Sequence, residues 1–147
     1  MAAVFDPSTE RGAGALHHLE TDIVAWLTTV TPEGQPQSMP VWFVWDATAG
    51  DRGEILVYGD HRAKRNRNLE ANPKVSFHIP VAARGGYVVV IEGTVVVDPD
   101  YPPVGENERY LAKYGRLIDG MGGPAVFGQT YSMPIRISPT KGLSFPP

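Results

Sequence analysis

A cluster of basic residues in the middle of the sequence has the chemistry of an anion site. Its members fall within six positions, directly after the apolar segment 55–58, and are Arg62, Lys64, Arg65 and Arg67. The pattern that follows predicts a helix that begins at this cluster and ends before Pro73. Cations in the first turns of a helix are unfavourable, because the helix dipole places partial positive charge there. A bound anion, most simply a phosphate-bearing ligand, would remove this conflict. The alternative is a solvated charged surface that binds nothing.

The overall composition makes this cluster a local feature. The 147-residue chain has a formal net charge of −3, so no general positive field attracts nucleic acid or an anionic membrane. Its size predicts one domain over residues 1–147. The absence of cysteine excludes disulfides, thiolate metal sites and a cysteine nucleophile. No apolar run approaches the roughly 20 residues of a membrane span, and the first residues show no signal pattern. These features predict a cytoplasmic protein.

The hydrophobic pattern predicts a mainly β protein of about six strands, most of them antiparallel. The expected strands cover 23–30, 35–45, 54–58, 75–79, 87–97 and 131–138. The expected helices are one that Ser8 or Thr9 caps and that runs to about Glu20, one from the basic cluster to about 72, and one over 106–121. Glu92-Gly93 interrupts the longest strand and predicts a bulge or a sharp bend there, whereas 81–86 is expected to be a loop. The arrangement favours a small closed β-barrel with helical additions over a dinucleotide-binding α/β fold.

The segment 41–45, Val-Trp-Phe-Val-Trp, is apolar at every position. A strand with one solvated face alternates between apolar and polar residues, so both faces of this strand are expected to be covered. One face can fill the core, and the other needs a ligand, a helix or a second subunit. Gln37 and Ser38, earlier on the same strand, carry polar groups that could reach a heterocycle or a phosphate. The alternative is that they are solvent-exposed residues next to a turn.

The remaining polar residues predict no self-sufficient catalytic site. His17 and His18 are adjacent, so on a helix they point about 100° apart and cannot readily share a metal, and no metal site is predicted. His61 differs because it lies beside the basic cluster, where it could add a hydrogen bond to an anion. No serine lies in a G-x-S-x-G motif, and no pair of carboxylates is evident. Any enzymatic chemistry is therefore expected to come from a bound cofactor.

Short motifs along the chain are individually weak but specific in their joint order. They are Trp26-Leu27-Thr28-Thr29, Pro32-Glu33-Gly34-Gln35-Pro36-Gln37, Pro40-Val41-Trp42-Phe43-Val44-Trp45-Asp46, Arg65-Asn66-Arg67-Asn68-Leu69-Glu70-Ala71-Asn72-Pro73-Lys74-Val75, Glu92-Gly93-Thr94 and Tyr131-Ser132-Met133-Pro134-Ile135-Arg136. In this order they resemble the split β-barrel superfamily of the pyridoxamine-phosphate-oxidase type, and specifically its actinobacterial, deazaflavin-dependent branch. The resemblance covers about residues 15 to 145.

The resemblance implies an FMN-binding type of split β-barrel that forms a homodimer with the cofactor at the subunit interface. In such proteins the basic residues of a K-x-R-N-L segment hold the cofactor phosphate, and the ring lies across the two-faced strand. Carried over, Arg65 takes the Lys position, which departs from the family pattern because Arg adds a planar fork. Lys64, one position earlier, is the alternative phosphate ligand. The expected cofactor-binding residues are Gln37, Ser38, Pro40, His61, Arg62, Lys64, Arg65, Arg67 and Asn68.

These observations predict an oxidoreductase that uses coenzyme F-420, a deazaflavin, to transfer a hydride to or from a small organic molecule. An FMN-binding oxidase or reductase on the same fold is an alternative, because the phosphate chemistry is shared. Another alternative is a non-catalytic protein that binds a flavin-like or haem-like ligand. The acidic poly-glutamyl tail of the deazaflavin would use further basic residues, for which Arg52, Arg62 and Arg84 are candidates.

Overall fold

The computed structural model describes residues 3–80 and 87–145, so the expected loop at 81–86 lies outside the described residues. Its strands are β1 (Ala25–Val30), β2 (Pro36–Val41), β3 (Val44–Asp46), β4 (Glu54–Gly59), β5 (Lys74–Ile79), β6 (Val88–Val97) and β7 (Met133–Phe145). Its helices are α1 (Glu10–Thr21), α2 (Arg65–Ala71), α3 (Glu108–Asp119) and α4 (Pro124–Thr130), with a short 3-10 helix η1 (Val104–Glu106). No helix in this described part of the chain is long and apolar enough to cross a membrane.

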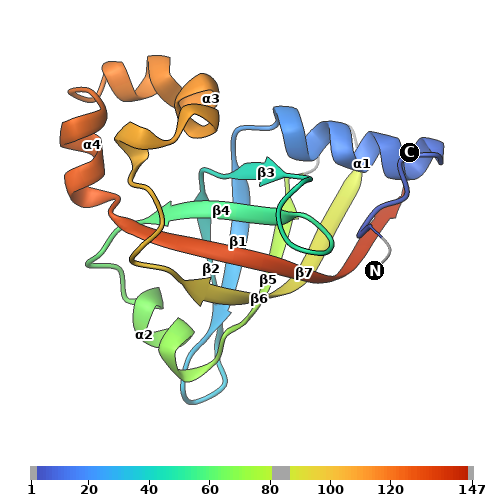
Figure 1. The fold of residues 1–147 in the computed structure, drawn as a ribbon. Coiled ribbons are helices and arrows are strands. Elements are labelled where there is room, and N and C mark those ends of the chain that lie inside the picture. The colour runs from blue at the N-terminus through green and yellow to red at the C-terminus, as the bar shows by residue number, and fades with distance from the viewer. Residues whose placement is uncertain (1–2, 81–86, 146–147) are drawn as a thin grey trace.

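The strands form one seven-stranded antiparallel sheet in the order β2-β1-β5-β6-β7-β4-β3. The sheet curls strongly, so that β1 and β5 run at a steep angle to β4 and the first part of β7 (Figure 1). The mainly β, split-barrel fold class predicted from the sequence is therefore confirmed. The expected closure is not seen, because no ladder between the edge strands β2 and β3 joins the described residues.

The interruption of the longest strand at Glu92-Gly93 is a bulge, as predicted. The register between β6 and β7 shifts between these two residues. At Gly93 a side chain would place its Cβ only 2.7 Å from the carbonyl oxygen of Ser138 on the neighbouring strand. Glycine is therefore required for the close approach of the two backbones where the sheet bends.

The single strand expected over 35–45 is wrong, because the chain leaves the sheet at Trp42-Phe43. Residues before this point pair with β1 at one edge of the sheet, and those after it pair with β4 at the other edge. The Phe43 N–H does not continue a ladder but donates to the hydroxyl of Tyr114 on α3 at 2.8 Å. The side chain of Trp42 stacks on the Tyr114 ring, 4.7 Å between centroids. The second face of this segment is thus covered by a helix of the same chain.

Two further expectations differ from the structure. The last strand continues well past Ser138 to Phe145, and residues 135–139 and 141–145 pair with β6. Helix α4 was not expected, since its apolar residues are few and lie close to the glycines that end the preceding helix. Phe127 on α4 is nevertheless buried, which explains why this segment folds against the rest of the protein.

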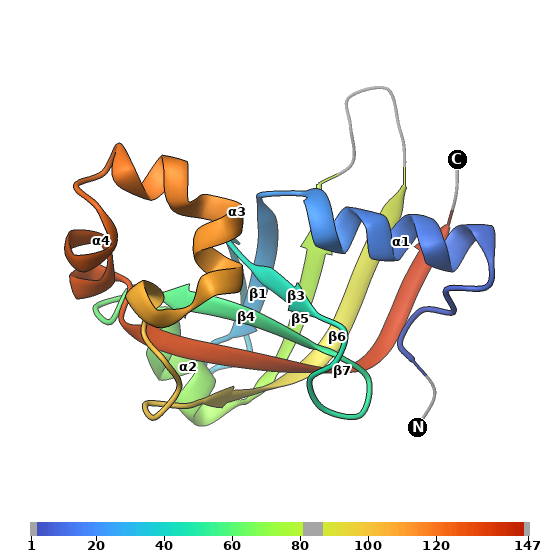
Figure 2. The ribbon, with the colours of Figure 1, turned by 45° about the horizontal axis from the view of Figure 1, so that its top comes forward.

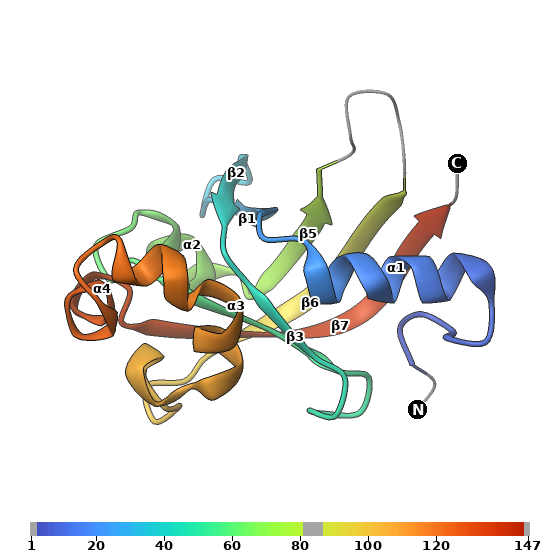
Figure 3. The same cartoon turned by 90° about the horizontal axis from the view of Figure 1, so that it is seen from above.

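The helices cover two separate hydrophobic clusters. Helix α1 lies across the concave side of the sheet (Figure 2), where Ala15 and Leu19 join the larger cluster inside the half-barrel. Helices α3 and α4 form a lobe at the far end of β4 and β7 (Figure 3). The second cluster is aromatic, and it is built from α3, α4 and η1 on residues of β3 and β4. The junction between the sheet and this lobe positions the candidate site.

Candidate functional site

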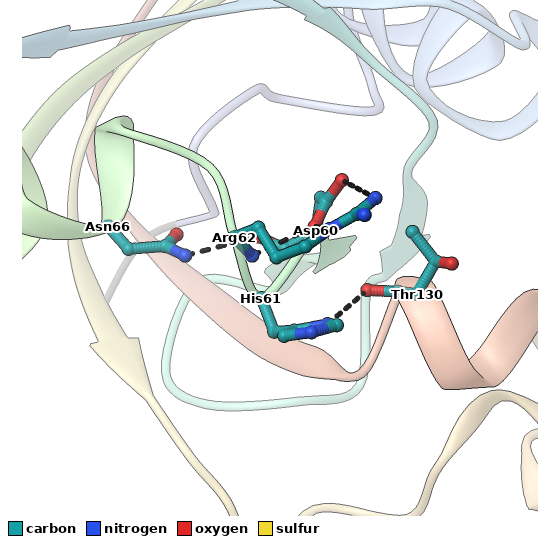
Figure 4. Close-up of polar contacts among 5 residues, drawn as sticks. All are labelled: Asp60, His61, Arg62, Asn66 and Thr130. Carbon is teal, nitrogen blue, oxygen red and sulfur yellow. Dashed lines mark hydrogen bonds and ion pairs between the residues drawn. The ribbon is translucent and has the colours of Figure 1, made fainter.

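The basic cluster spans the turn after β4 and the first residues of α2, a stretch that we call the basic segment (residues 60–67). Asp60 organises it: its carboxylate accepts hydrogen bonds from the Arg62 N–H at 2.8 Å and from the Arg62 guanidinium at 3.2 and 3.1 Å (Figure 4). The Asp60 carbonyl accepts from Asn66 Nδ2 at 3.0 Å. The hydrogen bond with Arg62 lowers the pKa of Asp60, so the pair is held in its charged form. The turn is therefore shaped before any ligand binds.

The sequence predicted that all four cations lie in the first turns of a helix, and this prediction is only partly correct. Helix α2 begins at Arg65, so Arg62 and Lys64 precede it. The reason is local: Asp60 ties the preceding residues into a turn, in which the Ala63 N–H donates to the Asp60 carbonyl at 3.0 Å. The conflict with the helix dipole is accordingly smaller than the sequence suggested.

His61 faces the helical lobe rather than the other cations. Its ring Nδ1 lies 3.0 Å from the carbonyl oxygen of Thr130, at the end of α4 (Figure 4). Because a carbonyl can only accept, Nδ1 carries the proton and Nε2 is the free ring nitrogen. The His61 N–H donates to the same carbonyl at 3.2 Å. His61 thereby joins the basic segment to α4.

An open groove lies between the basic segment and the β1–β2 hairpin. The groove has a volume of about 550 Å³ and is lined by Thr31, Pro32, Glu33, Gln37, Arg62, Ala63, Lys64, Arg67 and Asn68. The side chains of Lys64 and Arg67 are exposed and form no hydrogen bond or ion pair with any described residue. The cations outnumber the single carboxylate of Glu33. The groove is therefore suited to a compact anion with several acceptor oxygens.

Asn68 forms the buried floor of this groove. Its Nδ2 donates to Thr29 Oγ1 and to Gln37 Oε1, each at 2.9 Å. Thr29 and Gln37 are paired across β1 and β2, so one amide joins the helix to both strands. Asn68 and Thr29 are the buried polar residues of the described chain. This contact fixes the distance between the basic segment and the hairpin.

Ser38 lies on the other face of β2. Its hydroxyl is 2.6 Å from that of Thr28, its partner on β1. Because side chains alternate along a strand, Gln37 and Ser38 cannot reach one ligand from the same face. Arg52 also lies elsewhere, and its Nη1 donates to the Thr140 carbonyl at 2.6 Å. Arg84 lies outside the described residues.

A second recess, the aromatic cavity, lies on the other side of the basic segment. It has a volume of about 260 Å³, and Arg65 and Pro40 line it together with Trp42, Tyr110, Phe127 and Tyr131. Burial lowers the pKa of the Arg65 guanidinium, and the nearby Asp60 carboxylate and Tyr131 side chain offset part of that effect. Arg65 Nε and Asn66 Oδ1 are the buried side-chain polar atoms without a hydrogen-bond partner in the described part of the protein. The cavity thus contains an unpaired cation among apolar walls.

Apart from Trp42, which lies on the strand expected to need a ligand, a helix or a second subunit, the aromatic residues of this cavity were missed as site residues. Tyr110 is recognisable from the sequence only as part of the apolar stripe of α3, and Phe127 belongs to a helix that was not expected. Trp42 and Phe127 stack with their planes at 14°, and Phe127 and Tyr131 at 25°. Aromatic spacing alone does not separate a cavity wall from a core, so the sequence carried no usable signal.

No group of three or more His, Cys, Asp or Glu residues that could hold a metal occurs within residues 3–80 and 87–145. Of the residues expected to bind the cofactor, the groove brings together Gln37, Arg62, Lys64, Arg67 and Asn68. Two others, Arg65 and Pro40, line the aromatic cavity. Ser38 and His61 line neither recess.

Comparison with known proteins agrees with the fold and covers most of the chain. A solved F420 reductase is 25% identical with a TM-score of 0.60, covering 86% of this chain and 94% of that one. A pyridoxamine 5'-phosphate oxidase from Listeria innocua, so described provisionally, is 18% identical with a TM-score of 0.63, covering 88% and 94%. The heme storage protein of Vibrio cholerae is 20% identical with a TM-score of 0.53, covering 84% and 85%. The last two likenesses show the fold alone.

The chain matches no curated protein sequence. The family model described as pyridoxamine 5'-phosphate oxidase, however, matches residues 16–132, from α1 through the sheet and the helical lobe to the start of β7. The chain therefore belongs to the pyridoxamine 5'-phosphate oxidase family.

Proposed function

We propose that this protein is an oxidoreductase that uses coenzyme F-420, and that the groove holds the cofactor phosphate. Lys64 and Arg67 supply the cationic donors, and Arg62, Gln37 and Asn68 complete the lining. The F420 reductase of the same fold, at 25% identity, supports the deazaflavin over other cofactors. The observation that carries the proposal is the pair of exposed cations, Lys64 and Arg67, without partners among the described residues.

The residues present fit a phosphate. A phosphate accepts several charge-assisted hydrogen bonds, which are about twice as strong as neutral ones. Asn68 holds the hairpin and the basic segment at a set separation, so little ordering is needed when the anion arrives. The open side of the groove leaves room for an acidic tail to continue into solvent.

Because no catalytic constellation is recognised among the described residues, we assign the chemistry to the cofactor and its binding and orientation to the protein. A bound deazaflavin supplies the hydride-transfer chemistry. The protein's own residues bind the phosphate, orient the cofactor and exclude water from the reacting face. No described residue is assigned as a proton donor.

We also propose that the protein works as a homodimer with the cofactor near the subunit interface. Support comes from the β1–β2 hairpin at the edge of the sheet, where Met39 is 55% exposed on one face and Trp26 is 37% exposed on the other. Apolar side chains gathered at a sheet edge are typical of an association surface. Met39→Glu should give a folded monomer in analytical ultracentrifugation; an unchanged dimer would place the interface elsewhere.

The cofactor assignment is tested by fluorescence titration of cofactor-free protein with coenzyme F-420 and, separately, with FMN. We expect saturable binding of the deazaflavin that is tighter than binding of FMN. Preference for FMN would identify a flavin oxidase or reductase of the same family. Failure of both ligands to bind would remove the proposed function. Binding of F-420 without turnover of any acceptor would indicate a non-catalytic carrier.

A further inference from the structure

The aromatic cavity has no role in the proposed function, although its lining points to a ligand. Arg65 is the one charged residue that lines it in the described chain. Its Nε is buried and unpaired, and no acidic residue of the described chain forms an ion pair with it. A buried guanidinium N–H without an acceptor is costly, because it loses hydration and gains no hydrogen bond in return. A ligand oxygen in the cavity would supply the missing acceptor.

Two of the three tyrosine hydroxyls of the lining also lack partners among the described residues. The hydroxyls of Tyr110 and Tyr131 form no hydrogen bond with any residue that the structure describes. Tyr58 differs, since its hydroxyl donates to the Pro102 carbonyl and accepts from Asn107 Nδ2 at 3.0 Å. A guanidinium has only donors, and the two free hydroxyls can donate as well. The cavity is therefore complementary to a ligand that carries acceptor oxygens.

The shape and charge of the cavity narrow the ligand class. The rings of Trp42 and Phe127 stack on each other, with centroids 5.6 Å apart and planes at 14°, and contribute to an aromatic lining of the cavity. The volume of about 260 Å³ lies below the range of drug-sized pockets and suits one or two rings. One cation among apolar walls balances one negative charge, whereas a phosphate dianion would leave a charge buried without compensation.

We propose that the aromatic cavity binds a planar conjugated carboxylate. The carboxylate accepts hydrogen bonds from the Arg65 guanidinium, whose planar fork matches its geometry, and the conjugated part packs against Trp42 and Phe127. This inference concerns binding and goes beyond the proposed function. The site is separate from the phosphate groove, with which it shares no lining residue.

The test is isothermal titration of the cofactor-free protein with benzoate, cinnamate and 2-naphthoate, each compared with its neutral amide. At least one carboxylate should bind saturably and about tenfold tighter than its amide, as expected for a charge-assisted hydrogen bond. Arg65→Gln should abolish this preference. Lys64→Gln is the matched control, since it removes the adjacent cation from the groove and should leave the preference intact. Thermal unfolding of both variants checks that they are folded.

Three outcomes would overturn the inference. They are the absence of saturable binding by all three carboxylates, an equal loss of preference in Lys64→Gln, and displacement of the carboxylate by saturating F-420. The third outcome would place the cofactor itself in the cavity. Carboxylate binding by a protein that fails to bind F-420 would uphold this inference and remove the proposed function, so the two failures are distinguishable.

Discussion

Lys64 and Arg65 are adjacent in the chain, yet their side chains line different recesses. Lys64 caps α2 and faces the groove beside the β1–β2 hairpin, whereas Arg65 is the first residue of α2 and faces the aromatic cavity. Successive residues of a helix are rotated by about 100°, so these two charges point to different sides. The basic segment therefore serves two recesses rather than one.

Removal of a groove cation should weaken cofactor binding. We expect Lys64→Ala and Arg67→Ala each to lower the free energy of F-420 binding by about 1–3 kcal/mol, because each removes a charge-assisted hydrogen bond. The measurement is the fluorescence titration described above. Lys141→Ala, which removes an exposed cation from β7, is the control and should bind normally. Unchanged affinity in both groove variants would refute the assignment of the phosphate to this groove.

Asn68 should matter for stability as well as for binding. In Asn68→Ala the hydroxyl of Thr29 and the amide oxygen of Gln37 lose their shared donor inside the protein. We expect the free energy of unfolding, measured with urea, to fall by about 1–3 kcal/mol. Ser38→Ala removes an exposed hydrogen bond from the same hairpin and should change the stability by less than about 0.5 kcal/mol. Equal effects of the two substitutions would contradict the role given to the Asn68 floor.

The Tyr114 hydroxyl should stabilise the connection between β2 and β3. It accepts the Phe43 N–H at 2.8 Å and lies 2.8 Å from the Ile23 carbonyl, to which it donates. Tyr114→Phe leaves these buried backbone groups unpaired, so we expect a loss of about 1–3 kcal/mol in the free energy of unfolding. Tyr87→Phe is a suitable control, because its hydroxyl makes only a long, exposed contact of 3.4 Å with the Glu10 carbonyl. A Tyr114→Phe variant as stable as the parent would show that this hydroxyl is dispensable.

Lys113 should make stability depend on pH. Burial lowers its pKa to about 8, although Glu20 and Asp22 act in the opposite direction, and its Nζ donates to the Phe43 carbonyl at 2.9 Å. Between about pH 8 and the pKa of an unfolded lysine near 10.4, the unfolded chain binds more protons than the folded one. Stability should therefore rise with pH from about 8 to 10.

The matched substitution is Lys113→Met, which keeps most of the side-chain volume and removes the charge. Thermal unfolding of the parent and of this variant should be recorded at intervals between pH 7 and about 9, where few tyrosines of the unfolded chain ionise. The upward slope should be present in the parent and absent in Lys113→Met. If stability still rose with pH in Lys113→Met, another titratable group would be responsible for the slope.

Much of the fold could be predicted because it depends on patterns that act over a few residues. The alternation of apolar residues was sufficient for most strands, and Glu92-Gly93 marked the bulge between β6 and β7. Thr9, one of two candidate caps, does accept the Gly12 N–H at the start of α1. The division of residues 35–45 was not predictable, because it depends on Tyr114, which is 71 positions away from Phe43.

The candidate site, too, depends partly on local sequence patterns and partly on contacts between distant residues. The sequence by itself determined that cations gather after β4 and which family the chain resembles, because composition and motif order do not depend on the fold. The tertiary structure alone decided that Lys64 and Arg67 face the hairpin while Arg65 faces aromatic residues of α3 and α4. That separation arises from the rotation of a helix and the packing of distant segments against it, neither of which is written in a local pattern.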